Sequence, residues 1–214
     1  KKNILKMKKV LILGSNSFSG SSFVNHLLNK KTFKIVGISR SNELKYYFSP
    51  YFKNKHINNF NFYKLDINRN LKKIIDLIKE FKPEYIINYS AQSMVGESWN
   101  TPIDWYNTNV LGTINLIENI KKNRFLKKYI HFSTPEVYGS TSKNIIENMN
   151  FNPSTPYAVS RSAADSHISL LNKEIGFPSI ITRASNVYGE FQNIYRIIPI
   201  TILKILKKEK LYLH

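Results

Sequence analysis

The sequence has no cysteine among its 214 residues. This absence excludes a disulfide scaffold, a thiolate nucleophile and any metal site that depends on sulfur. No apolar run approaches the roughly 20 residues that cross a bilayer, and the residues before Val10 show no signal-peptide pattern. We therefore expect a cytoplasmic protein that has no membrane partner and no metal site.

Acidic residues are also scarce, with 14 Asp and Glu against 32 Lys and Arg. The resulting net charge of +18 raises the question of nucleic acid as a partner. The excess is mostly lysine spread over every segment, without a stripe of arginine and aromatic residues. We interpret it as a compositional bias and expect no nucleic-acid partner, although a positive field attracts small anions.

The hydrophobic pattern predicts an α/β fold. Apolar runs of strand length cover residues 10–13, 33–38, 60–65, 85–89, 129–132 and 179–182, and helical patterns cover 23–28, 71–81, 108–120, 157–175 and 196–208. Strands that are buried on both faces read as continuous apolar runs. Their alternation with helices predicts a Rossmann-type, doubly wound parallel sheet with helices on both faces and a ligand at the carboxyl ends of the strands.

A turn rich in serine and glycine follows the first expected strand. In such a turn, backbone N–H groups and a helix N-terminus face a pyrophosphate. The middle glycine position of the usual pattern holds Ser17, which either crowds a phosphate or donates to it. An ordinary strand-to-helix turn is the alternative, but the position in a β-α-β unit favours a dinucleotide. The candidate cofactor residues here are Gly14, Asn16, Ser17, Phe18, Ser19 and Gly20.

The ends of the next two strands bear on which dinucleotide is bound. Ser39 and Arg40 stand where an acid would accept hydrogen bonds from the adenosine ribose. A guanidinium beside hydroxyl groups suits a 2′-phosphate, which favours NADP over NAD. The alternative is that Arg40 is one more solvated cation. Asp66 can accept a hydrogen bond from the adenine amino group, or it can cap the helix that begins near Asn70.

Two further segments carry residues suited to catalysis. Ser133, Thr134 and Glu136 follow a buried strand, at the edge of the sheet where ligands bind. Tyr157 and Arg161 lie one turn apart on an expected helix, so they share a face. A fixed cation favours the phenolate, which can act as a base. Each residue alone would more often be structural, but their combination after a dinucleotide turn indicates an enzyme.

These segments together resemble the extended short-chain dehydrogenase/reductases, and within them the nucleotide-sugar 4,6-dehydratases. The resemblance runs from Val10 to the last residue and includes residues 88–95, 108–113 and 182–189. It implies further cofactor contacts from Ile67, Tyr89, Ser90, Ala91, Thr108, Tyr157 and Arg161. It implies substrate contacts from Ser93, Met94, Val95, Ser133, Thr134, Asn186 and Arg196.

The resemblance also implies a reaction. A nucleotide-diphosphate hexose is oxidised at C4 while Tyr157 takes the hydroxyl proton, and Thr134 hydrogen-bonds the sugar. Glu136 removes the C5 proton, water leaves from C6, and the hydride returns to C6. The product is a nucleotide-linked 4-keto-6-deoxy sugar, and a homodimer is implied.

The sequence departs from the family pattern at two catalytic positions. Pro135 replaces the Asp that protonates the leaving hydroxyl in the dTDP-glucose branch, and Arg161 replaces the usual Lys. Gln92 and Arg40 resemble the GDP-mannose branch, whereas residues 185–189 and 195–199 resemble the dTDP-glucose branch. The sugar and the base therefore stay open. An epimerase or reductase, or a non-catalytic nucleotide-binding module, remains an alternative.

The resemblance divides the chain at residue 183. Residues 1–183 correspond to the NAD(P)-binding domain, and residues 184–214 correspond to the start of a smaller C-terminal substrate domain. Another strand is expected to begin over residues 211–214. We expect a truncated version of the family, with a nearly complete cofactor domain and a half-built substrate site.

Overall fold

The computed structural model describes residues 7–142 and 144–211. Its strands are β1 Lys8–Leu13, β2 Phe33–Ser39, β3 Phe60–Lys64, β4 Tyr85–Asn88, β5 Lys128–Ser133 and β6 Ser179–Arg183. They form one sheet in the order β3-β2-β1-β4-β5-β6, and every neighbouring pair is parallel. The order reverses between β1 and β4, where such folds bind dinucleotides. The predicted α/β fold is confirmed.

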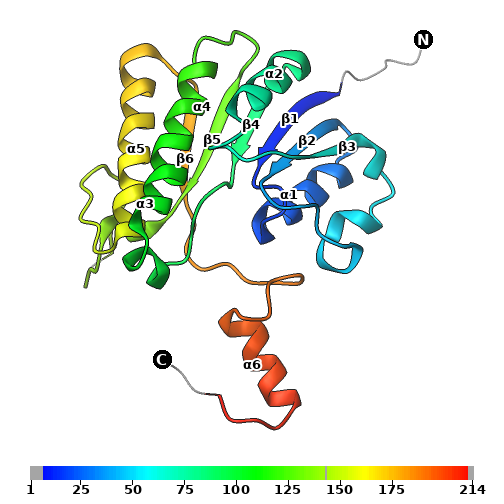
Figure 1. Cartoon of the computed structure of the whole chain (residues 1–214), viewed down its shortest axis with the longest axis vertical. Helices are drawn as coiled ribbons and strands as arrows, with labels where there is room; N and C mark the ends of the chain where they lie inside the picture. Colours follow the sequence, from blue (N-terminus) through cyan, green and yellow to red (C-terminus); the bar gives the residue numbers. More distant parts are fainter. Residues whose placement is uncertain (1–6, 143, 212–214) are drawn as a thin grey trace.

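Helices cover both faces of this sheet (Figure 1). They are α1 Phe18–Asn29, α2 Leu71–Phe81, α3 Pro102–Trp105, α4 Thr113–Ile120, α5 Pro156–Ile175 and α6 Ile197–Leu206. Alternate residues of β1 point to opposite faces. Leu11 and Leu13 join a core cluster with residues of α2, α4 and α5. Val10 and Ile12 join a second core cluster with residues of α1.

Side-chain caps explain where two helices begin. The Ser17 hydroxyl accepts a hydrogen bond from the Gly20 N–H (3.0 Å), so α1 begins before the apolar pattern does. Thr155 caps α5 in the same way through Ala158 N–H (3.1 Å), with Pro156 at the first helical position. These caps fix the helices against the carboxyl edge of the sheet.

The expected helix over residues 108–120 differs from what the structure shows. Helical backbone begins at Pro102 in α3 and continues as the π-helix η5 (Tyr106–Gly112) before α4. The sequence also missed three short 3-10 helices between β2 and β3, at Tyr46–Phe48, Pro50–Lys53 and Ile57–Asn59. Buried Tyr51 anchors this segment to the α1 side of the core. Turns this short carry no periodic signal.

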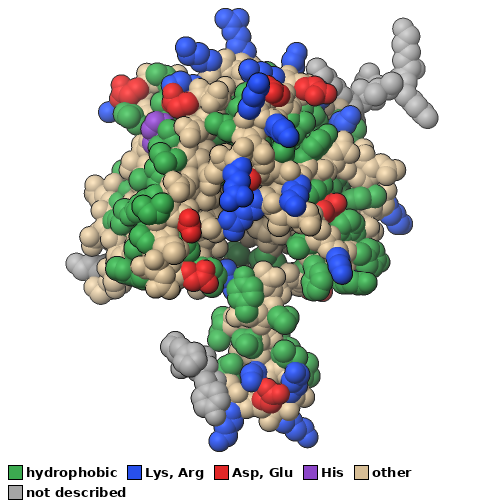
Figure 2. All heavy atoms as spheres, viewed as in Figure 1, with side chains coloured by type: hydrophobic (Ala, Val, Ile, Leu, Met, Phe, Trp, Pro, Cys, Tyr) green, Lys and Arg blue, Asp and Glu red, His purple; other side chains and the backbone are tan. Residues whose placement is uncertain are grey.

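The last element, α6, lies away from the layered body (Figure 1). None of its residues is buried, and Figure 2 shows apolar side chains over this lower part of the molecule. The strand expected to begin at Leu211 lies outside the described residues from position 212 onward. In the described parts of the chain, every helix is too short or too polar to cross a membrane.

Candidate active site

A cavity of about 260 Å³ opens at the carboxyl ends of β1 to β4. Predicted cofactor residues line it: Gly14, Asn16, Ser17, Ser39, Arg40, Asp66, Ile67, Tyr89, Ser90, Ala91 and Thr108. Phe18, Ser19, Gly20, Tyr157 and Arg161 are not part of its lining. The sequence reasoning missed Ser41 and Asn68, although each lies within two residues of a predicted residue at a strand end.

The first turn depends on close backbone contacts. Gly14 has a φ of +76°, and a Cβ there would lie 2.8 Å from the Tyr89 carbonyl carbon. A Cβ on Gly20 would lie 2.2 Å from the Gly14 carbonyl oxygen. The Ser17 hydroxyl caps α1, so the turn keeps its shape although serine occupies the middle glycine position of the pattern. Phe18, Ser19 and Gly20 form the first turn of α1, whose N–H groups suit an anion.

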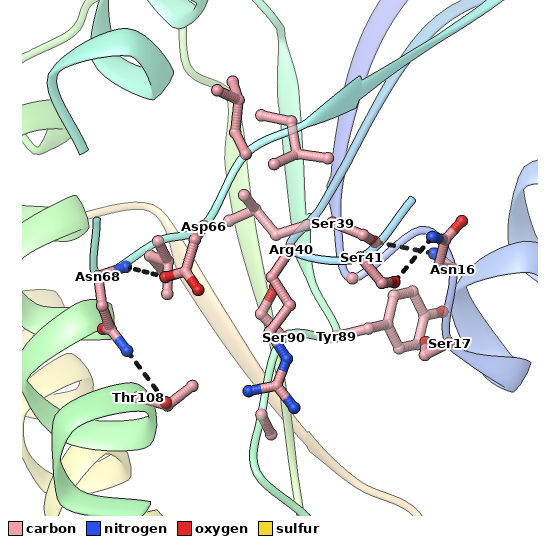
Figure 3. Close-up of a pocket in the computed structure, with 16 residues that line it drawn as sticks. Asn16, Ser17, Ser39, Arg40, Ser41, Asp66, Asn68, Tyr89, Ser90 and Thr108 are labelled. Atoms are coloured by element: carbon pink, nitrogen blue, oxygen red, sulfur yellow. Dashed lines mark hydrogen bonds between the residues drawn. The ribbon is translucent and has the colours of Figure 1, made fainter. Parts of the chain in front are cut away.

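A hydrogen-bond network lies at the end of β2 (Figure 3). Asn16 donates from its backbone to Ser39 Oγ (3.0 Å) and from its side chain to Ser41 Oγ (3.1 Å). Arg40 lies between these serines and is exposed, and its Nη2 donates to Gln92 Oε1 (3.1 Å). Arg40 is the one cation among the described residues that line the cavity. A single cation with hydroxyl groups fits a phosphate group.

The opposite wall of the cavity follows β3. Asp66 Oδ1 accepts hydrogen bonds from the backbone N–H groups of Asn68 (2.7 Å) and Arg69 (3.3 Å). The Asn68 side chain donates to Thr108 Oγ1 (3.1 Å), which links this wall to η5 (Figure 3). Asp66 therefore stabilises the turn before α2 and does not cap that helix, whose N-cap residue is Asn70. A contact between Asp66 and adenine stays a prediction.

Three of the predicted catalytic residues lie together beyond β5. Thr134 caps the 3-10 helix η6 (Pro135–Tyr138), because its Oγ1 accepts from Glu136 N–H (3.3 Å). Tyr157, which is 8% exposed, is hydrogen-bonded to Thr134. Burial raises the pKa of Tyr157, while Arg161 and Thr134 lower it. Glu136 remains accessible to solvent, and partial burial raises the pKa of its carboxyl group.

Arg161 shares a helix face with Tyr157 but points into the protein. It is 1% exposed, and its Nη2 donates to the backbone carbonyl of Phe132. Its Nε and Nη1 are buried and have no hydrogen-bond partner among the described residues. Arg161 does not line the cavity, and its direct contact with a cofactor stays a prediction. The guanidinium acts on Tyr157 through its charge, because it is directed at β5 instead of the cavity.

Ser133 also has a different partner from the one expected. Its hydroxyl donates to Asp165 Oδ2 (2.8 Å), and Arg183 donates to the same oxygen from Nη2 (2.9 Å) and Nε (3.1 Å). Arg183 Nη1 also donates to the Tyr138 hydroxyl (3.0 Å). This buried network joins α5, β5, β6 and η6, and the sequence reasoning missed it. The one feature of the sequence that could have indicated this network is Asp165, which lies one turn after Arg161 on the same helix face.

The predicted substrate residues are only partly brought together. Ser93, Met94 and Val95 lie in the loop after β4, and Ser93 and Met94 are exposed. Asn186 and Arg196 are exposed in the segment before α6. Within residues 7–142 and 144–211, the Arg196 guanidinium contacts only the neighbouring Tyr195 ring, at 5.4 Å. The structure thus places Asn186 and Arg196 without contact to Thr134 or Tyr157.

The described residues contain no cluster of three or more His, Cys, Asp or Glu that could hold a metal ion.

Comparison with known proteins identifies relatives of this chain. The chain is 29% identical over 211 residues to a dTDP-glucose 4,6-dehydratase from Haemophilus influenzae, covering 92% of this chain and 61% of that protein.

Solved structures resemble this one closely. A dTDP-glucose 4,6-dehydratase from Bacillus anthracis, solved in complex with NAD, has a TM-score of 0.78 and 31% identity, covering 95% of this chain and 63% of that one. A UDP-N-acetylglucosamine 4-epimerase from Methanobrevibacter ruminantium has a TM-score of 0.83, with 95% and 64% coverage. Its identity of 24% shows the shared fold alone.

The chain spans about three-fifths of the length of these relatives, 61% of the Haemophilus protein and 63% of the Bacillus chain. A family model described as GDP-mannose 4,6 dehydratase matches residues 11–214, which is nearly the whole sequence. The match includes both the cavity at the end of β1 and the residues around Tyr157. The chain therefore belongs to the GDP-mannose 4,6-dehydratase family, within the nucleotide-sugar dehydratases and epimerases of the short-chain dehydrogenase/reductase type.

Proposed function

We propose that this chain carries the cofactor site and the catalytic residues of a nucleotide-sugar 4,6-dehydratase. The observation that carries the proposal is the position of Glu136 next to Thr134 and Tyr157, beyond β5. Epimerisation at C4 needs no base for the C5 proton, whereas dehydration does. An accessible carboxylate with a raised pKa suits that base.

The chain's residues divide the proposed reaction between them. A nicotinamide held in the cavity would serve as the internal carrier for the hydride that leaves C4 of the sugar and returns to C6 within one turnover. Tyr157 takes the C4 hydroxyl proton, and Thr134 hydrogen-bonds that hydroxyl. Glu136 removes the C5 proton, which the C4 ketone acidifies, and water leaves from C6. Pro135 has no proton to donate, so Glu136 passes its proton to the leaving hydroxyl. Hydride addition to C6 then leaves an enolate, which takes a proton from solvent at C5, and Tyr157 releases the C4 hydroxyl proton to solvent.

The cavity fits a dinucleotide, because the Gly14 turn admits close backbone approach and the end of β2 offers a cation with hydroxyl groups. We propose NADP as the preferred form, on the basis of Arg40. The Bacillus anthracis relative was solved with NAD, so the preference is a difference to be measured. Calorimetry with both cofactors tests it, and equal or tighter NAD binding contradicts it.

We further propose that residues 1–183 form the cofactor domain and that residues 184–214 begin the substrate region. Support comes from β6, which ends the sheet at Arg183, and from residues 184–190, which are all exposed. The exposed α6 then belongs to this substrate region. The cytoplasmic location expected from the sequence stays a prediction.

The decisive experiment incubates the chain with NADP or NAD and with dTDP-glucose, GDP-mannose or UDP-glucose. Mass spectrometry then follows each sugar nucleotide. Loss of one water together with a new keto group supports the dehydratase. A product of unchanged mass with an altered C4 configuration supports an epimerase. Cofactor binding without any product supports a non-catalytic nucleotide-binding module.

A further inference from the structure

The guanidinium of Arg40 extends away from the two hydroxyl groups beside it in the sequence. Ser39 and Ser41, the hydroxyl groups beside it, both face Asn16 on one wall of the cavity. The Arg40 side chain instead extends into the middle of the cavity, between that wall and the wall of Asp66, Asn68 and Thr108 (Figure 3). There its Nη2 donates to Gln92 Oε1 (3.1 Å), 52 residues away in the chain.

Gln92 is a firmly anchored partner. Its backbone N–H donates to Asn109 Oδ1 (2.8 Å), and its carbonyl accepts from Asn109 Nδ2 (3.0 Å). Asn109 is fully buried in η5 and also donates to Ser160 Oγ (2.9 Å) on α5. The backbone of Gln92 is therefore fixed to the helix layer, and its side chain meets Arg40 from that anchored position.

The hydrogen bond between Arg40 and Gln92 is weak enough for a phosphate to replace Gln92 as the acceptor. Within residues 7–142 and 144–211, the Arg40 guanidinium forms no ion pair, and its one hydrogen bond goes to the neutral amide of Gln92. A phosphate accepts a stronger, charge-assisted bond from the same group. A 2′-phosphate beside Ser39 and Ser41 would lie away from the position in which Gln92 holds the guanidinium, so the two groups compete for the Arg40 side chain. The affinity for that phosphate is reduced by the fraction of molecules in which Arg40 is held.

We infer that Gln92 is a specificity-determining residue, which holds Arg40 across the cavity and so limits the preference for a 2′-phosphorylated cofactor. The inference rests on the proposed function, because it assumes that the cavity binds a dinucleotide. The cofactor preference then depends on two residues, Arg40 after β2 and Gln92 after β4, whereas the sequence analysis used Arg40 alone.

The test compares adenosine 2′,5′-bisphosphate with AMP, which differ only in the 2′-phosphate. Calorimetry measures both affinities for the wild-type chain, Gln92→Leu and Gln92→Glu. Leucine frees Arg40 and should tighten bisphosphate binding about fivefold, the size expected from losing one competing hydrogen bond. Glutamate forms an ion pair with Arg40 and should weaken bisphosphate binding about fivefold. AMP affinity should change little in Gln92→Leu.

Arg40→Ser provides the control background. Both Gln92 substitutions should lose their effect on the ratio of the two affinities when Arg40 is absent. If both nucleotides bind and the ratio stays constant across the Gln92 variants, the inference is overturned and the cofactor site stands. If leucine weakens bisphosphate binding, Gln92 presents Arg40 to the phosphate, and the inference is again overturned. If the wild-type chain binds neither nucleotide, the proposed cofactor site itself fails.

Discussion

At the scale of single residues, Glu136 and Tyr157 should fail at different steps. Replacing Glu136 with Gln keeps its size but removes the base, so C4 oxidation should continue while elimination slows about a hundredfold to ten-thousandfold. Mass spectrometry should then detect a 4-keto sugar that retains its C6 hydroxyl. Tyr157→Phe is the matched control and should yield no ketone. A Glu136→Gln chain that dehydrates at the wild-type rate would assign the base elsewhere.

The raised pKa of Glu136 gives this residue a pH signature. A base works only when it is deprotonated, so the rate of elimination should fall as pH decreases through the pKa of Glu136. Because partial burial raises that pKa, the fall should begin at a higher pH than for an ordinary carboxylate. The pH dependence of product formation measures this limb. An active Glu136→Asp variant should still lose rate as pH decreases through the pKa of its carboxyl group, whereas the rate of Glu136→Gln should show no such decrease.

His131 should make stability depend on pH. Burial, Arg161 and Arg183 all lower its pKa in the folded chain, where it is fully buried 3.9 Å from Asp165. The unfolded chain binds a proton on His131 near pH 6.5, and the folded chain resists it. The resulting stability is therefore present above about pH 6.5 and is lost as pH falls below it.

Urea unfolding at several pH values measures this effect. The free energy of unfolding should fall between pH 7.5 and pH 5.5 by up to about 1.4 kcal/mol per pH unit for one proton. His131→Gln should flatten the slope in this range, and the control His26→Gln should keep it. Asp165 titrates in the opposite sense, since burial raises its pKa. An unchanged slope in His131→Gln would exclude His131 as its source.

At the scale of elements, the turn between β1 and α1 should tolerate no side chain at Gly20. A Cβ there would meet the Gly14 carbonyl oxygen at 2.2 Å and Ser17 Oγ at 2.9 Å, so the Ser17 cap and the turn must shift. Gly20→Ala should cost about 1 to 3 kcal/mol of unfolding free energy. Gly96→Ala is the control, because nothing lies within 4 Å of its Cβ. Equal stability of the two variants would show that the turn adapts.

The strands and the longer helices were predictable because buried parallel strands and amphipathic helices carry strong periodic signals. Helix starts were less predictable, since they depend on caps such as Ser17 and Thr155 that lie outside the apolar pattern. The π-helix η5 follows from packing: buried Asn109 must reach both Gln92 and Ser160. A local sequence pattern holds no information about such distant partners.

At the scale of the whole molecule, the sequence located the cavity well, because strand ends of a parallel sheet meet at one edge. The sequence did not predict which partners the polar side chains around the cavity would contact. Arg161 points to β5, Arg40 crosses to Gln92, and Ser133 faces Asp165, each because of a partner far away in the chain. Asn186 and Arg196 precede α6, and the structure shows no contact that places them at the catalytic residues.

The outer helix layer should mediate a homodimer, which we propose from its exposed apolar side chains. They are Ile103 on α3 (65% exposed), Leu111 on η5 (54%), and Val159 (38%) and Leu170 (54%) on α5. These elements pack against one another, so the side chains belong to one layer. A second copy of the chain would bury them, and burying a lysine without a partner there would be costly.

Sedimentation of the wild-type chain and of Leu111→Lys and Leu170→Lys tests this assembly. Each substitution should shift the chain from dimer toward monomer, by at least tenfold in the dissociation constant, since an unpaired buried charge costs several kcal/mol. Tyr47→Lys is the control: Tyr47 is 70% exposed on the 3-10 helix η1 (Tyr46–Phe48), in a segment that packs on the α1 side of the sheet. A monomeric wild-type chain, or a dimer that only Tyr47→Lys weakens, would contradict the proposal. In the second case the interface would lie on the opposite face of the sheet, next to the segment between β2 and β3.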